Sequence, residues 1–143
     1  MTIVAAERAA EYLGIEVKKT PLAWLEAVEK GLPVARLESF AKRIAPGNAQ
    51  FKYHIVKKAT YARRKEAKPA RLSKEESEVL LRIAQVFAFA EDVWGGADQA
   101  IAFLSTAHPL LEGQTPLDVT LRSEVGARLV EDILGRLAYG SAA

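Results

Sequence analysis

Apolar residues recur every three or four positions along almost the whole chain, and no segment alternates with the period of two that marks a half-buried strand. Glycine and proline divide this pattern into segments of ordinary helix length. We therefore expect an all-α protein, with a helix-turn-helix-like bundle in the N-terminal half and a small helical domain in the C-terminal half. The predicted helices cover about residues 4–13, 21–30, 33–45, 51–56, 73–94, 98–106 and 123–138, with two further helices that begin near Thr60 and Thr115.

Several predicted helix starts carry side chains that can satisfy the free backbone amides of a first turn. Thr20 precedes a proline at the first helical position, which is a favoured place for proline. Ser73 and Glu76 are expected to form a capping box, in which each side chain binds the backbone amide of the other residue. Thr60 is expected to cap a short basic helix, and the pair Gly95-Gly96 to end the long one.

The composition is that of an ordinary globular protein. Half of the 143 residues are apolar and 27% are charged, unlike a disordered or collagen-like chain. No apolar run reaches about 18 residues, so no membrane-spanning helix is expected. Residues 1–8 carry charge where a secretory signal needs its apolar segment. The chain has no cysteine, which excludes disulfides and a cysteine nucleophile, and we expect a cytoplasmic protein.

The formal net charge of +2 conceals opposite charges in the two halves. Residues 1–70 contain 14 Lys and Arg against 7 Asp and Glu, whereas residues 71–143 contain 6 against 11. The sign changes next to Lys68-Pro69, where the proline also interrupts the helical pattern. We therefore predict two domains, at residues 1–68 and 69–143. This asymmetry indicates that the N-terminal half meets a polyanion.

The basic residues surround a helix–turn–helix spacing. A helix over residues 32–45, the break at Pro46-Gly47-Asn48 and a helix over residues 51–56 are typical of a reader of the DNA major groove. Lysine and arginine neutralise phosphates, and arginine also pairs with guanine. The alternative is an ordinary helical hairpin with a solvated basic face. The residues expected to contact DNA are Lys52, Lys57, Lys58, Arg63, Arg64 and Lys65.

The last predicted helix is apolar over a wide arc, which indicates that it packs on more than one surface. One of these surfaces would be a second subunit, so we expect a homodimer. The alternative is a helix at the centre of its own small bundle. The residues expected at the dimer interface are Leu129, Val130, Ile133 and Leu137.

No pattern in the chain supports catalysis. His54 and His108 lie in different halves, without the spacing of a metal site, and no nucleotide-binding or nucleophile motif is present. Neighbouring acids such as Glu75 and Glu76 point about 100° apart on a helix and do not share a site. We expect no catalytic residue, no metal and no cofactor, and hence a protein that is not an enzyme.

Three short motifs occur in order along the C-terminal half. They are Gly113-x-Thr115-Pro116, Gly126-x-x-x-Val130 and Arg136-x-x-Tyr139-Gly140, and they follow a segment that reads Ala90-Glu91-Asp92-Val93-Trp94-Gly95-Gly96. Together with the segment at residues 71–77 they resemble the antitoxins of the Xre/MbcA/ParS type over about residues 60–140. The N-terminal half resembles the helix-turn-helix domain of these antitoxins by its position and charge.

This resemblance implies a function. Members of the family are antitoxins of type II toxin–antitoxin pairs, with a C-terminal toxin-binding domain, and the usual partner is a RES-domain toxin that degrades NAD. They also dimerise and repress their own operon through operator DNA. For this chain, the resemblance implies inhibition by occlusion, with Arg136, Tyr139 and Gly140 in contact with the toxin and residues 141–143 entering its substrate cleft.

Two alternative functions remain open at this stage. The first is a homodimeric helix-turn-helix transcription regulator without a toxin partner. The second is a helical adaptor whose basic face meets an acidic partner other than DNA.

The chain also departs from the family at Phe103, where a tryptophan is common, and at Glu112, where a second glycine is common.

Overall fold

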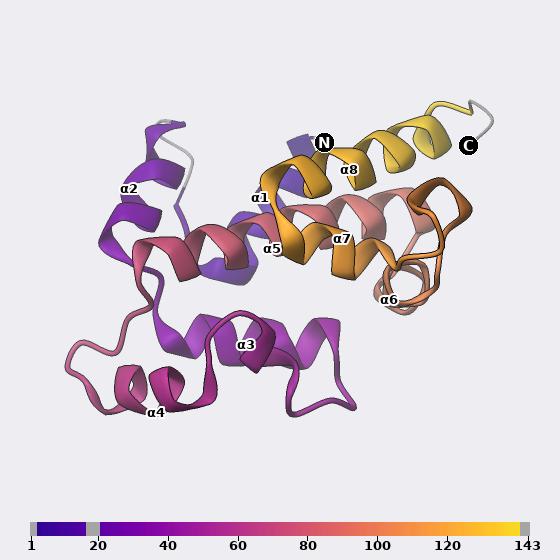
Figure 1. The fold of residues 1–143 in the computed structure, drawn as a ribbon. Helices are drawn as coiled ribbons and strands as arrows, with labels where there is room; N and C mark the ends of the chain where they lie inside the picture. Colours follow the sequence, from indigo (N-terminus) through magenta and orange to yellow (C-terminus); the bar gives the residue numbers. More distant parts are fainter. Residues whose placement is uncertain (1–2, 17–20, 141–143) are drawn as a thin grey trace. The chain divides into compact units, whose positions relative to one another are not determined.

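The computed structural model describes residues 3–16 and 21–140, and within them the fold is entirely helical except for an isolated bridge between Pro33 and Arg71. The all-α prediction is confirmed for these residues. In chain order the helices are α1 (Ile3–Leu13), α2 (Leu22–Lys30), α3 (Val34–Ile44), the 3-10 helix η1 (Phe51–His54), α4 (Lys58–Glu66), α5 (Lys74–Trp94), α6 (Ala97–Ser105), the 3-10 helix η2 (Pro109–Leu111), α7 (Pro116–Arg122) and α8 (Glu124–Ala138) (Figure 1).

The chain forms two compact units, which divide within α1 and within α5. One unit contains residues 9–81, and the other contains residues 1–8 and 82–143. The sequence placed a boundary between residues 68 and 69, where the charge changes sign. The compact unit extends further because the first turns of α5 belong to it: the Ser77 hydroxyl accepts a hydrogen bond from the Leu32 amide at 2.9 Å, and Leu80 is fully buried.

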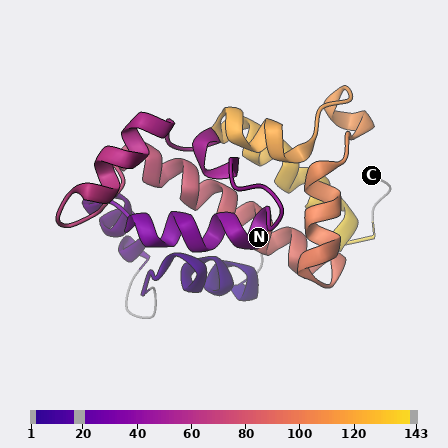
Figure 2. The ribbon, with the colours of Figure 1, turned by 90° about the horizontal axis from the view of Figure 1, so that it is seen from below.

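The unit of residues 9–81 is built around the buried face of α3. Leu37, Phe40 and Ile44 lie on this face at helical spacing and are almost completely buried. Two backbone hydrogen bonds join the segment before α3 to the segment before α5, from Val34 to Ala70 and from Leu72 to Leu32. Figure 2 shows α3 and α4 as separate helices, connected by the stretch that contains η1.

The other unit is organised around the second half of α5. Residues 83–90 of this helix are buried on nearly every side, as expected for a helix at the centre of a bundle. Figure 1 shows α6, α7 and α8 gathered around it. Helix α7 packs closely on α8 at Gly126, because a Cβ there would collide with the Val119 carbonyl oxygen.

Side-chain caps confirm the predicted starts of α5 and α7. The Glu76 amide donates to the Ser73 hydroxyl at 3.1 Å and the Ser73 amide donates to the Glu76 carboxylate at 2.8 Å, which completes the capping box. The Thr115 hydroxyl caps α7 by accepting from the Asp118 amide at 3.1 Å. The prediction for Thr20 lies outside the described residues.

Two predictions about the segment after α3 are wrong. The predicted helix over residues 51–56 is a single 3-10 turn at Phe51–His54. Helix α4 begins at Lys58 rather than at Thr60, and the extended residue before it is Lys57, with ψ near 146°. The side chain of Thr60 is suited to a cap, but the backbone turns into the helix two residues earlier, so Thr60 lies inside it.

Candidate nucleic-acid interface and toxin-binding unit

Helix α4 carries four of the six residues predicted to contact DNA, and a fifth directly precedes it. Lys57, Lys58, Arg63 and Lys65 are exposed, whereas Arg64 is half-buried. The sixth, Lys52, is half-buried on η1. The structure therefore places five of these residues on α4 and the residue before it, just beyond the segment predicted as a helix at residues 51–56.

The outward face of α4 combines small side chains with an arginine. Ala59, Ala62 and Arg63 are exposed. Ala59 and Arg63 project from the side of the helix opposite the buried Tyr61, and Ala62 lies beside them. Two alanines allow the helix backbone to approach another surface closely, and the neighbouring guanidinium can bind a phosphate or pair with a base edge.

Two tyrosines lie under the basic side chains. The Tyr53 and Tyr61 rings meet edge to face with centroids 5.8 Å apart, and the Lys52 ammonium stands over both rings at 5.3 and 5.0 Å. Burial, together with a hydrogen bond to Glu38, raises the pKa of Tyr61 to about 12. This phenol therefore stays neutral, and the tyrosine pair orients Lys52 through cation–π attraction.

Two of the residues predicted to contact DNA form ion pairs with carboxylates of the same unit. The Arg64 guanidinium binds Glu76 with Nε 3.1 Å from Oε1, and the Lys65 ammonium lies 3.6 Å from Glu38. Burial alone would raise the pKa of Glu76, but the Ser73 amide and the Arg64 guanidinium outweigh it and lower this pKa below its ordinary value. Arg64 thus joins α4 to the capping box of α5.

The cations that remain available are Lys57, Lys58 and Arg63. Among residues 3–16 and 21–140, none of the three has a carboxylate within ion-pair distance. They form the candidate nucleic-acid interface, together with the small outward face of α4.

The four residues predicted at a dimer interface do not share one surface. Val130 is fully buried and Ile133 is 5% exposed, so both belong to the core of their own unit. Leu137 is half-buried and lines a pocket. Leu129 is 50% exposed, and it lies one turn after Val125, which is 66% exposed and is not one of the four predicted interface residues. An apolar surface on α8 therefore exists, but it is narrower than predicted.

The residues expected to contact a toxin lie at the end of α8. Arg136 is exposed in the last turn of α8, and Tyr139, which follows the helix, is 83% exposed. Gly140 has a φ of +74°, a conformation that favours glycine. Residues 141–143, expected to enter a cleft, lie outside the described residues.

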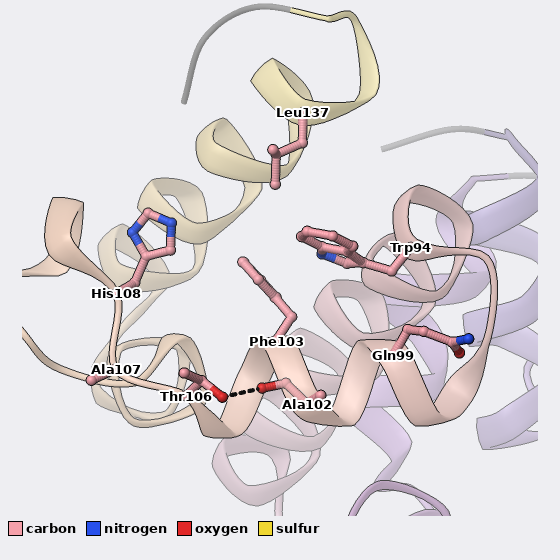
Figure 3. Close-up of a pocket in the computed structure, with 8 residues that line it drawn as sticks. All are labelled: Trp94, Gln99, Ala102, Phe103, Thr106, Ala107, His108 and Leu137. Carbon is pink, nitrogen blue, oxygen red and sulfur yellow. Dashed lines mark hydrogen bonds between the residues drawn. The ribbon is translucent and has the colours of Figure 1, made fainter.

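A pocket of about 470 Å³, which no sequence pattern predicted, lies next to this helix end. Figure 3 shows Phe103 of α6 between Trp94, at the end of α5, and His108, with Leu137 of α8 facing them. The Phe103 centroid is 5.7 Å from that of Trp94 and 6.1 Å from that of His108. His108 also accepts a hydrogen bond at Nδ1 from the Leu110 amide, at 3.1 Å. In the sequence, this pocket could have been indicated by two aromatic residues, Trp94 before Gly95-Gly96 and Phe103 after it.

Neither a metal-binding cluster nor a membrane-spanning helix is present in the part of the chain that the structure describes. No group of three or more His, Asp or Glu side chains there could hold a metal ion. No helix there is long and apolar enough to cross a membrane.

Comparison with known proteins assigns both halves of the chain. Residues 23–85 match the antitoxin Xre-like helix-turn-helix domain, and residues 89–140 match the antitoxin Xre/MbcA/ParS C-terminal toxin-binding domain. A protein named Antitoxin Xre from Yersinia enterocolitica is 37% identical over 78 residues, which are 54% of this chain and 52% of that protein. The chain therefore spans about half the length of this relative. With these two domains in order, the chain belongs to the Xre family of antitoxins.

Proposed function

We propose that this chain is the antitoxin of a type II toxin–antitoxin pair, that it neutralises a RES-type toxin that degrades NAD, and that it represses its own operon as a homodimer. The observation that carries the proposal is the presence of both family domains in one chain, one for DNA and one for a toxin. No cofactor or catalytic group is required, because both activities are binding.

Helix α4 is the proposed recognition helix. It has nine residues and a length of about 13 Å, enough to lie in a major groove, whereas the four residues of η1 extend only about 8 Å. The exposed Arg63 would reach a base edge or a phosphate from the outward face, and Lys57 and Lys58 would bind phosphates at the start of the helix. Arg64 and Lys65 would hold the helix in place.

A salt titration of operator binding tests this assignment. Arg63→Ala should weaken binding to the promoter of the operon about tenfold and lower the slope of log K against log salt by about one unit. Arg128→Ala, which removes an exposed arginine of α8, is the matched control and should change neither value. Equal affinity and slope for Arg63→Ala and the unchanged protein would contradict a role for α4 in DNA binding.

The end of α8 is the proposed inhibitory segment. Arg136 and Tyr139 are exposed there, so both side chains are free to bury themselves in a partner. An arginine and a tyrosine are frequent hot-spot residues of protein interfaces. They would cover the NAD site of the toxin, with Gly140 allowing the chain to turn into it.

Co-expression with the product of the neighbouring gene, here called the operon partner, tests this second assignment. The unchanged protein should restore growth and the cellular NAD level, and Arg136→Ala combined with Tyr139→Ala should lose most of this protection while DNA binding persists. Arg128→Ala is again the control. Full protection by the double variant would mean that inhibition comes from another surface.

The second candidate function is a homodimeric transcription regulator without a toxin partner. The exposed face of α4 favours it, because this face serves DNA binding whether or not a toxin exists. The same co-expression experiment decides between the two functions. If the operon partner neither slows growth nor binds the unchanged protein, the regulator is the better description.

A further inference from the structure

The pocket beside α8 is open and almost entirely apolar. Its walls come from three helices and the loop after α6, and its lining residues are Trp94, Gln99, Ala102, Phe103, Thr106, Ala107, His108 and Leu137. A volume of about 470 Å³ exceeds that of any single side chain and matches a small-molecule or side-chain binding site. In Figure 3 the Trp94, Phe103 and Leu137 side chains converge on the same space.

The large apolar side chain of Trp94 is only partly covered by its own unit. Its side chain ends α5 and is 42% exposed, although it already stacks on Phe103 at 5.7 Å. Covering such a ring removes apolar surface from water, and tryptophan is one of the residues enriched in interface hot spots. The site therefore fits an apolar side chain from a partner protein.

The surroundings of the pocket indicate which partner this is. All eight lining residues fall within residues 89–140, the part that matches the toxin-binding domain. Leu137 lies in the pocket wall between Arg136 and the exposed Tyr139, so the pocket is continuous with the proposed inhibitory segment. A toxin that holds this segment would reach the pocket without a second interface.

We infer that the Trp94–Phe103–Leu137 pocket is the anchor site for the toxin, which inserts an apolar side chain into it while the end of α8 covers the toxin's substrate site. The inference rests on the proposed antitoxin function. It separates two roles within one interface: the pocket supplies affinity, and Arg136 with Tyr139 supplies inhibition.

Fluorine NMR of the full chain labelled with 5-fluorotryptophan tests the inference directly. The chain has two tryptophans, Trp94 in the pocket and Trp24 on α2, so each spectrum carries its own internal control. Addition of the unlabelled operon partner should shift or broaden the Trp94 resonance and leave that of Trp24 in place. A complex that elutes as one species while Trp94 stays unchanged would overturn the inference.

A variant that fills the pocket with a larger side chain provides a second test, in which binding of the operon partner is measured. Ala102 is an exposed residue of the lining, so Ala102→Phe fills the space without removing a core side chain. It should weaken binding of the operon partner at least about tenfold. Ala35→Phe makes the same change at an exposed alanine of α3, in the other unit, and should leave toxin binding unaffected.

The outcomes separate this inference from the proposed function. If the unchanged protein and Ala102→Phe bind the operon partner equally well, the antitoxin function stands and the anchor site is wrong. If the unchanged protein does not bind at all, the antitoxin function fails and the inference fails with it. A Trp94 resonance that shifts with protein concentration alone would assign the pocket to a second copy of the chain and overturn the inference.

Discussion

A single carboxylate, that of Glu76, connects three parts of the unit of residues 9–81. It accepts from the Ser73 amide and binds the Arg64 guanidinium, so it both caps α5 and fixes the orientation of α4. The side chains of Arg64 and Glu76 are 31% and 15% exposed, which shields the pair from solvent better than a surface ion pair. The helix proposed to read DNA is thus oriented by a residue that does not itself contact DNA.

The stability of this arrangement should depend on pH with a definite sign. Because the folded-state pKa of Glu76 lies below its ordinary value of 4.5, the charged carboxylate stabilises the fold above that pH, and the contribution is lost as the pH falls through the lower folded-state value. Glu76→Gln, which keeps an acceptor for the cap but removes the charge, should cost about 1 kcal/mol at pH 7. Urea unfolding followed by circular dichroism should show this difference disappear as the pH falls below the lowered folded-state pKa of Glu76. A difference that is independent of pH would contradict the role of the charge.

At the scale of elements, the contact between α7 and α8 depends on the absence of one side chain. Gly126 lies in the first turn of α8 and is buried, and an added Cβ would collide with the Val119 carbonyl oxygen of α7. Backbone cannot move aside as the end of a flexible side chain can. The close approach of α7 and α8 therefore requires a glycine at position 126.

Two glycine-to-alanine changes on α8 should have opposite effects. Gly126→Ala should destabilise the protein by about 2 kcal/mol or more, because α7 and α8 must separate. Gly135→Ala, where a Cβ meets open space in the helix interior, should stabilise it by up to about 1 kcal/mol through helix propensity. Thermal unfolding of the two variants checks both signs. Equal effects would mean that α7 and α8 are not in close contact.

At the scale of the whole molecule, the first turns of α5 decide where the N-terminal unit ends. Leu72, Ser77 and Leu80 are buried with residues that precede position 68. A fragment of residues 1–85 should therefore fold, whereas a fragment of residues 1–68 should be largely unfolded by circular dichroism. A stable fragment 1–68 would support the boundary predicted from the charge pattern instead.

The proposed dimer belongs to the same scale, and the exposed surface of α8 permits a sharper test than its buried positions. Val125→Glu combined with Leu129→Glu should give a folded protein of half the sedimenting mass, because both side chains are exposed in the single chain. Ile133→Asp, which places a carboxylate in the core of the unit, should cost several kcal/mol and unfold it. A double variant that sediments as a dimer would place the interface elsewhere.

The sequence by itself determined the features that depend on neighbours within one or two helical turns. The capping box of α5, the cap of α7 and the stop after Trp94 are local interactions, and they follow from the order of a few residues. The family resemblance also followed from short motifs in order. The boundaries were wrong near Thr60, because the backbone turned there without a side-chain cap.

Only the tertiary structure decided which of these residues are free to act. Arg64 and Arg63 are adjacent and chemically identical, yet one binds a carboxylate 12 positions away and the other is exposed. Similarly, Val130 is buried and its neighbour Leu129 is exposed, although both are apolar residues of one helix. The pocket arises where the end of α5, α6 and α8 meet. Pairing, burial and cavities depend on residues brought together by packing, and no local pattern in the chain encodes them.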